Sequence, residues 1–540
     1  MTTSRRRFIA SSGTALAAAS GWPMFLPRRA EFDLVIRGGT IYDGTGAPGI
    51  DRDLGILAGR IEAIGQELRG REEIDARGMA VTPGFIDIHS HADGSLRDDP
   101  RGESAIRQGI TTIIAGQDGG SRATGAAERS FTEYFTALDR IGPGPNVAAM
   151  VGLGTVRGAV VGSDDRPATP DELARMTALV EQALAQGACG ASSGLEYTPG
   201  AFASLEELVA LARPLRARGL PYATHMRNED DRLLDSIDES IAVAAGAGCR
   251  LHISHLKTQG PRNWARLDDA FDRIERAVAA GGDVSFDRYP YLAYSTGLTN
   301  LFPVASRDGG TDAFLARLED PAAGPAIREA TLAKVELIGG WDNVQITSVR
   351  AEQDRGAEGR RLGAYAAERG ADPYRFTVEL LTRNGGSVGM VGFAMSEANL
   401  ERILAHPLGM VCTDGGGFAI DGPTRRGSPH PRGIGSFPRV LGRYVRERNV
   451  MPLAEAVRKM TSLPASRVRL DDRGRLARGL AADVVVFDPA RIADRATFED
   501  PFQYATGIDA VVVNGVLTLQ GGARRGSRGS GRALRPAAAT

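Results

Sequence analysis

The sequence of 540 residues contains few cysteines and, beyond its first 30 residues, no long apolar run. The three cysteines are Cys189, Cys249 and Cys412. They form no CxxC pair and leave one thiol unpaired whatever bridges form, so a disulfide-based scaffold is not expected. No segment after residue 30 reaches the roughly 20 uninterrupted apolar residues that a membrane-spanning helix needs. The sequence therefore predicts a globular protein.

The sequence also lacks an excess of charge of either sign. It carries 65 basic and 66 acidic residues, a net charge of −1. Such a balance does not favour binding to nucleic acid or to a membrane surface, and a small molecule is the expected partner. Lysine itself is scarce, because it occurs only at Lys257, Lys334 and Lys459, and almost all positive charge is arginine.

The first 30 residues resemble a twin-arginine export signal. Residues 4–9 read SRRRFI and precede a mildly apolar stretch rich in Ala, Ser and Gly, which ends near the small residues at 17–19 that a signal peptidase accepts. We therefore expect export by the twin-arginine machinery, and a periplasmic or secreted protein with no membrane attachment after cleavage. A disordered basic tail is the alternative interpretation.

Two regions near the ends of the chain read as short strands separated by Gly-rich turns. One region includes residues 32–37 and 77–81, and the other includes residues 482–488 and 510–515. We expect residues 31–83 and 466–520 to pair into one small β-sandwich. The last segment, 521–540, is rich in Gly, Ser and Arg, so we expect a flexible tail there.

Between these regions, apolar strand candidates alternate with helical stretches, which is typical of a parallel sheet with crossover helices. Eight candidates occur, at residues 84–91, 111–116, 147–153, 190–197, 221–226, 250–256, 283–289 and 409–414. Eight units favour a closed (β/α)8 TIM-like barrel of the α/β class over residues 84–465. About 120 residues separate the last two candidates, which predicts an insertion at about 297–390 over the barrel mouth.

Four of the seven histidines lie where such strands end. His89 and His91 are two residues apart, so on a strand their imidazoles point to the same face and can share one divalent metal, to which zinc is well suited. His225, His255 and Asp414 close later strands. Because the carboxyl ends of barrel strands meet on one face, we expect these five side chains to converge in a metal-dependent hydrolase site.

The motifs around these residues resemble a known family. Residues 82–91, TPGFIDIHSH, resemble the first barrel strand of the amidohydrolase superfamily. Further motifs resemble its N-acyl-D-amino-acid deacylase (D-aminoacylase) branch: SGLEYTPG at 193–200, THMR at 224–227, ISHLK at 253–257, YPY at 289–291, HPRG at 430–433, KMTSLPA at 459–465 and residues 479–489. Together they span nearly all of the chain after the export signal.

The resemblance implies roles for individual residues. It makes four histidines metal ligands at the ends of the first, fifth and sixth strands: His89, His91, His225 and His255. It makes Asp414 the general base, which accepts a proton from a metal-activated water and passes it to the departing nitrogen. It places four further residues around the carboxylate and developing oxyanion of the substrate: Tyr197, Lys257, Tyr289 and Ser295.

One position departs from the branch pattern. At the end of the second strand the branch has a metal-binding cysteine in an Asn-Cys-Gly triplet, whereas this chain has Gln117-Asp118-Gly119. Asp118 is a harder ligand that can bind one metal or bridge two, and a turn aspartate is the alternative. A carbamylated lysine, as in hydantoinases and dihydroorotases, belongs on the fourth strand, and residues 187–194 contain no lysine. Those cyclic-amide hydrolases are therefore disfavoured.

The resemblance thus predicts an enzyme that binds one or two Zn²⁺ ions, or another divalent metal, and hydrolyses the amide bond of an N-acyl-D-amino acid. Two alternatives stay open. The first is an exported dipeptidase or cell-wall-fragment amidase of the same superfamily. The second is a non-catalytic, amidohydrolase-like binding protein, whose site changed when aspartate took the place of the cysteine.

Overall fold

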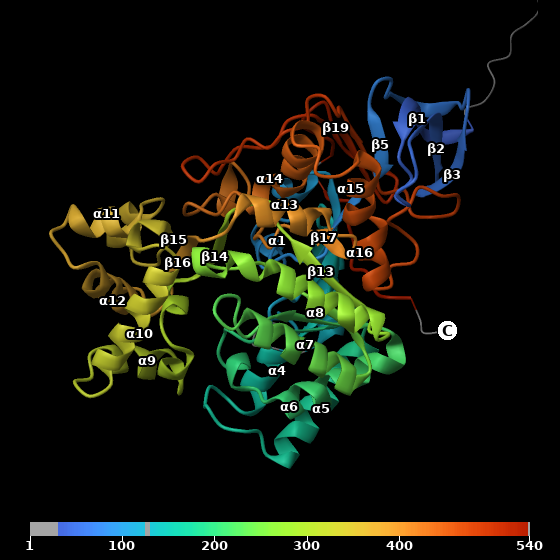
Figure 1. Cartoon of the computed structure of the whole chain (residues 1–540). Helices are drawn as coiled ribbons and strands as arrows, with labels where there is room; N and C mark the ends of the chain where they lie inside the picture. The colour runs from blue at the N-terminus through green and yellow to red at the C-terminus, as the bar shows by residue number, and fades with distance from the viewer. Residues whose placement is uncertain (1–30, 125–129, 527, 538–540) are drawn as a thin grey trace, which may run out of the picture.

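The structure, a computed structural model, describes residues 31–124, 130–526 and 528–537. A central barrel carries a β-rich lobe built from both ends of the chain and, on the opposite side, a second lobe from the insertion (Figure 1). The expected export signal, residues 1–30, lies outside the described residues. No helix in the described part of the chain is long and apolar enough to cross a membrane.

The barrel consists of parallel strands, as the sequence predicts. Its strands are β6 (Phe85–Asp87), β7 (Ile110–Ala115), β8 (Asn146–Ala149), β9 (Val151–Gly152), β10 (Ala191–Gly194), β11 (Pro221–His225), β12 (Arg250–Ile253), β13 (Val284–Arg288) and β17 (Gly409–Val411). Strands β8 and β9 flank Met150 and together form the third barrel position. The ring closes where Ser90 bridges Gly415 in parallel and the Asp414 amide donates to the His89 carbonyl, 2.8 Å away. The expected fold class is confirmed.

Helices cover the outside of the barrel. They include α3 (Phe131–Ile141), α4 (Leu153–Val160), α5 (Pro170–Ala185), α6 (Leu205–Ala212), α7 (Leu233–Ala247), α8 (Leu267–Ala279), α13 (Glu397–Ala405), α14 (Arg432–Arg439), α15 (Leu453–Met460) and α16 (Ser462–Arg467). Helix α5 shows how the sequence sets such a boundary. Thr169 and Glu172 form a capping box around Pro170, which satisfies amide groups that a helix start leaves without partners.

The β-rich lobe is one nine-stranded sheet rather than two separate sheets. Its strands are β1 (Phe32–Ile41), β2 (Ile50–Leu57), β3 (Arg60–Gly65), β4 (Gly70–Asp75), β5 (Ala80–Pro83), β18 (Val484–Phe487), β19 (Ile508–Val513), β20 (Val516–Gln520) and β21 (Ala523–Arg524). The two ends of the chain meet where β5 pairs antiparallel with β18. Alternate residues of these strands, such as Ile36 and Val484, are buried in a shared core.

The described residues after 520, where the sequence predicts a flexible tail, pack against the rest of the protein. Strand β21 extends the sheet, and the chain then runs along the barrel, where the Leu534 amide donates to the Val147 carbonyl at 2.8 Å. The side chain of Leu534 is 6% exposed. The Gly, Ser and Arg content that predicts disorder is overridden here by pairing with backbone far away in the sequence.

The insertion forms its own small lobe. Strands β14 (Ala293–Gly297), β15 (Val344–Ser348) and β16 (Gly389–Phe393) build an antiparallel sheet, with β16 in the middle. Helices α9 (Thr311–Leu318), α10 (Gly324–Leu337), α11 (Leu362–Ala367) and α12 (Pro373–Arg383) pack beside it, as the yellow lobe in Figure 1 shows. The lobe begins at Ala293, slightly earlier than predicted, because β14 pairs with a segment some 95 residues later. Its first strand therefore reaches the barrel mouth.

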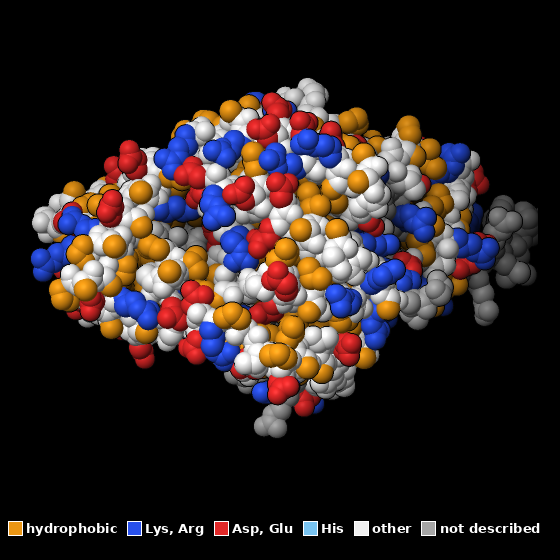
Figure 2. Space-filling view, turned by 60° about the horizontal axis from the view of Figure 1, so that its bottom comes forward, with side chains coloured by type: hydrophobic (Ala, Val, Ile, Leu, Met, Phe, Trp, Pro, Cys, Tyr) orange, Lys and Arg blue, Asp and Glu red, His pale blue; other side chains and the backbone are white. Residues whose placement is uncertain are grey.

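The surface agrees with a chain of balanced charge. In the face drawn in Figure 2, basic and acidic side chains are interspersed over the barrel and both lobes. This face offers no extended field of one sign to attract a polyanion.

Candidate metal centre

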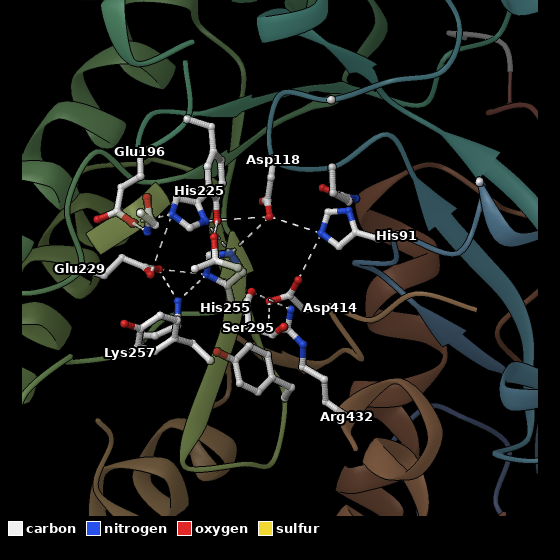
Figure 3. A pocket seen from close by; sticks show the side chains of 18 of the residues that line it. His91, Asp118, Glu196, His225, Glu229, His255, Lys257, Ser295, Asp414 and Arg432 are labelled. Carbon is white, nitrogen blue, oxygen red and sulfur yellow. Dashed lines mark hydrogen bonds and ion pairs between the residues drawn. The ribbon is translucent and has the colours of Figure 1, made fainter. Parts of the chain in front are cut away.

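The barrel mouth holds a cavity of about 560 Å³ in which the predicted residues meet. Four of the five candidate metal ligands line it: His91, Asp118, His225 and His255. Asp414 lines it as well, and His89 lies beneath, fully buried. In Figure 3, Asp118 stands between His91 and Asp414 on one side and the two later histidines on the other. The sequence thus predicts correctly which side chains converge, although they come from five different strands.

Asp118 is the centre of this arrangement. Its Oδ2 atom lies 3.4 Å from Nε2 of His89 and 3.4 Å from Nε2 of His91. The same oxygen lies 3.6 Å from Nε2 of His255 and 3.9 Å from Nδ1 of His225. One carboxylate oxygen therefore contacts two groups of donors, one made of His89, His91 and Asp414 and the other of His225 and His255. An aspartate that served only to form the turn would have no reason to lie this close to four histidines.

The donors fit a divalent metal, because several have no other partner. Nε2 of His89 and Oδ1 of Asp118 are buried without a hydrogen bond. Leaving such atoms unpaired costs about 1–3 kcal/mol each, and a bound cation would remove this cost. Imidazole nitrogen and carboxylate oxygen are donors that suit zinc and related ions.

The backbone at this site is held in an uncommon conformation. Asp118, His255 and Asp414 have φ angles of 53°, 35° and 47°, in the left-handed region that residues other than glycine rarely adopt. Each lies two or three residues beyond the end of its strand, where the turn directs the side chain toward the barrel axis. Such strain persists only where the surrounding structure imposes it, and it is common at functional sites.

Electrostatics within the site are dominated by its carboxylates. Burial alone would lower the pKa of His91, but Asp118 and Asp414 outweigh it and raise that pKa to about 9. Burial likewise opposes the ionised form of Asp118, yet the histidines hold its pKa well below the usual range. The site therefore concentrates negative charge, which attracts a cation.

Further carboxylates stand behind the histidines, and sequence reasoning assigned them no role. Nδ1 of His255 lies 2.9 Å from Glu229, Nε2 of His225 lies 3.3 Å from Glu196, and Nδ1 of His89 lies 3.4 Å from Asp287. Paired in this way, a histidine keeps one nitrogen facing the metal, and its orientation is fixed. Glu196 lies within the SGLEYTPG motif and Glu229 lies just beyond THMR. This closeness to the motifs is the only feature of the sequence that could have indicated a role for the two glutamates.

Asp414 is placed for proton transfer. Its Oδ1 is 3.2 Å from Nε2 of His91, and its Oδ2 accepts a hydrogen bond from Arg432 at 2.7 Å. Burial would raise the pKa of Asp414, but Arg432 and the neighbouring histidines lower it below the usual value. Arg432, in the HPRG motif, was not among the predicted site residues. It keeps Asp414 charged and oriented.

All four predicted substrate contacts line the same cavity: Tyr197, Lys257, Tyr289 and Ser295. Tyr289 offers a buried hydroxyl without a partner, which is free for a ligand. The ammonium of Lys257 is paired with Glu229 and lies 2.7 Å from Nδ1 of His255, so one of its three N–H donors is left for a ligand. The Tyr197 hydroxyl accepts a hydrogen bond from Thr296 at 3.2 Å, and Ser295 lies on β14 of the insertion.

A parallel barrel with histidine and aspartate donors at its carboxyl ends defines a metal-dependent hydrolase class. The chain belongs to the amidohydrolase family, whose model matches residues 72–519. It is 38% identical to a D-aminoacylase of Alcaligenes xylosoxydans xylosoxydans over 527 residues, which is 94% of this chain and 98% of that protein. It is 36% identical to an N-acyl-D-aspartate deacylase of the same organism, over 94% of this chain and 96% of that one.

Solved structures give the same result. The crystal structure of N-acyl-D-glutamate deacylase from Bordetella bronchiseptica, complexed with zinc and a phosphonate inhibitor that mimics the tetrahedral intermediate, superposes with a TM-score of 0.81. The sequence identity is 36%, and the match covers 93% of this chain and 99% of that one. The similarity therefore extends over both the barrel and the β-rich lobe.

Proposed function

We propose that this protein is a metal-dependent hydrolase that cleaves the amide bond of N-acyl-D-amino acids, releasing a carboxylate and a D-amino acid. The observation that carries the proposal is the sharing of Asp118 between two groups of donors, with Asp414 beside them in a cavity that also offers donors for a carboxylate. Three relatives that are 36–38% identical over at least 90% of this chain support it, because they are named as a D-aminoacylase, an N-acyl-D-aspartate deacylase and an N-acyl-D-glutamate deacylase.

The metal ligands in this proposal are His89, His91 and Asp118 for one ion, and Asp118, His225 and His255 for a second. These residues would hold a divalent ion, which would supply activation of water and polarisation of the amide carbonyl. Glu196, Glu229 and Asp287 orient the histidines from behind. These carboxylates fix which ring nitrogen faces the cavity.

The remaining side chains handle the proton and the substrate. Asp414 accepts a proton at its carboxylate and delivers it to the departing nitrogen, while Arg432 holds it in place. The Tyr289 hydroxyl and the remaining N–H donor of Lys257 bind the substrate carboxylate in the cavity that both residues line. Tyr197 and Ser295 line the cavity and are the residues that we expect to contact the oxyanion that develops on the substrate.

A chirality screen tests the proposal. Zinc-loaded protein should hydrolyse N-acetyl-D-amino acids much faster than their L-enantiomers and faster than dipeptides. Asp414→Asn should retain the metal but lose turnover by about 100- to 10,000-fold, the usual contribution of a general base. Preferred cleavage of dipeptides would favour the dipeptidase alternative instead. Less than one metal equivalent in the wild-type protein would favour the non-catalytic one.

We also propose that the protein is exported by the twin-arginine machinery, on the basis of the SRRRFI sequence and the weakly apolar stretch that follows it. Changing Arg5, Arg6 and Arg7 to lysine should retain the protein in the cytoplasm of an expressing bacterium. Fractionation that finds the variant and the wild-type protein in the same compartment would contradict export by this route.

A further inference from the structure

Arg122 lies on the loop after β7, four residues beyond Asp118, and lines the same cavity. Its guanidinium rests against Gly94, where a Cβ atom would stand 3.1 Å from Nη1 of Arg122. The absence of a side chain at residue 94 therefore leaves room for the guanidinium at the cavity wall. Both residues lie beside the metal-binding histidine His91 in the lining of the cavity.

Arg122 differs from the other basic side chains that line the cavity. Lys257 is paired with Glu229, and Arg432 donates to Asp414. For Arg122 no ion pair or hydrogen bond occurs among the described residues, and its Nε atom is buried without a partner. An arginine that lines a cavity without an acidic partner among the described residues is available to bind an anion there.

Asp93 lines the same end of the cavity and attracts Arg122 without forming an ion pair with it. The attraction keeps the guanidinium at this wall. Because the two groups do not pair, the planar fork of N–H donors of Arg122 stays available. That fork has the geometry that binds a carboxylate through two parallel hydrogen bonds.

The position of Arg122 indicates which half of the substrate it meets. It follows the second strand of the barrel, and Lys257 follows the sixth, so the two lie on opposite sides of the eight-stranded ring. The metal-binding donors lie between them. If Lys257 and Tyr289 hold the amino-acid carboxylate, as proposed above, then Arg122 faces the acyl half.

We propose that Arg122 is a specificity-determining residue that binds a carboxylate at the far end of the acyl group. The preferred substrates are then N-acyl-D-amino acids whose acyl group derives from a dicarboxylic acid, such as a succinyl group. This inference rests on the proposed deacylase function and adds the class of acyl group to it.

Two matched substrates test the inference. N-succinyl and N-butyryl derivatives of the same D-amino acid have acyl chains of similar length and differ in a terminal carboxylate against a methyl group. The zinc-loaded wild-type protein should show a kcat/KM for the succinyl compound about 10- to 100-fold above that for the butyryl compound, the range expected of charge-assisted hydrogen bonds. In Arg122→Met the ratio should fall to about one, mainly through a higher KM.

Two further variants serve as controls. Arg122→Lys keeps the charge but loses the bidentate fork, so it should keep part of the preference. Arg175→Met removes an exposed arginine on α5, away from the cavity, and should leave the ratio at its wild-type value. Metal content measured for each variant shows whether the centre is intact.

The outcomes separate this inference from the proposed function. A wild-type protein that hydrolyses both substrates without preferring the succinyl compound overturns the role of Arg122. So does an Arg122→Met protein, with its metal bound, that retains the wild-type ratio. Failure of the wild-type protein to hydrolyse any N-acyl-D-amino acid would refute the proposed function itself, and the inference with it.

Discussion

Asp118→Asn should remove one of two metal ions. Among the described residues, Asp118 is the one carboxylate that lies next to both groups of donors. Without its charge, the first group still has His89, His91 and Asp414. The second is left with the two imidazoles of His225 and His255, one ligand short of the three protein ligands usual at a catalytic zinc.

The expected magnitude follows from this count of ligands. The wild-type protein should retain two zinc ions per chain after dialysis against buffer with micromolar zinc, and Asp118→Asn should retain about one. The loss of affinity at the second site should exceed the roughly 10- to 100-fold contributed by carboxylates that merely orient a ligand. Asp118→Cys is the matched control, because a thiolate can bridge two ions, and it should restore two while favouring softer metals.

Elemental analysis of the dialysed proteins, calibrated against protein concentration, measures the stoichiometry directly. Two equivalents in Asp118→Asn would show that Asp118 is not the shared ligand. One equivalent in the wild-type protein would show that the second group of donors is not a metal site at all. Either result would refute the interpretation of the short contacts around Oδ2.

Three other predictions address the surroundings of the site and the fold. Asp287→Ala should weaken zinc binding by about 10- to 100-fold, measured by competition with a chelator, because His89 loses the carboxylate beside its Nδ1. Lys257→Met should raise the KM for N-acetyl-D-amino acids by about tenfold or more and change kcat less, since the lost contact holds the substrate before and during reaction. Leu534→Ala should destabilise the protein by about 2–3 kcal/mol in urea unfolding, whereas a loose tail would leave its stability unchanged.

Local sequence patterns were sufficient to predict the barrel strands and the side chains at their ends. A run of β-branched residues that ends in a histidine can be recognised within about eight residues of sequence. Because the carboxyl ends of parallel barrel strands lie on one face, recognising the strands is enough to predict that these ends come together. His89, His225 and Asp414 were therefore predictable as one group. The same patterns predicted that the two ends of the chain would pair, because both read as short strands.

The carboxylates behind the histidines could not be predicted in this way. Asp287 reaches His89 from the seventh strand, and Glu229 reaches His255 from the loop after the fifth. Each contact depends on the diameter of the closed barrel and on the rotamer of the side chain. The local sequence determines neither of these two properties. Arg122 and Leu534 were missed for the same reason, since their importance comes from what lies across the fold.

The backbone at Asp118 gives a physical reason why an aspartate is tolerated there. The residue must adopt a left-handed φ of 53° so that its side chain turns inward from the end of β7, and Asp and Asn enter that region several-fold more readily than most residues. The following Gly119 also has a positive φ, and its missing side chain leaves room for the backbone of Ser193 and Gly194. A short acidic side chain on such a turn reaches both groups of donors. The conformation that places a metal ligand at this point of the barrel is therefore one that favours a carboxylate.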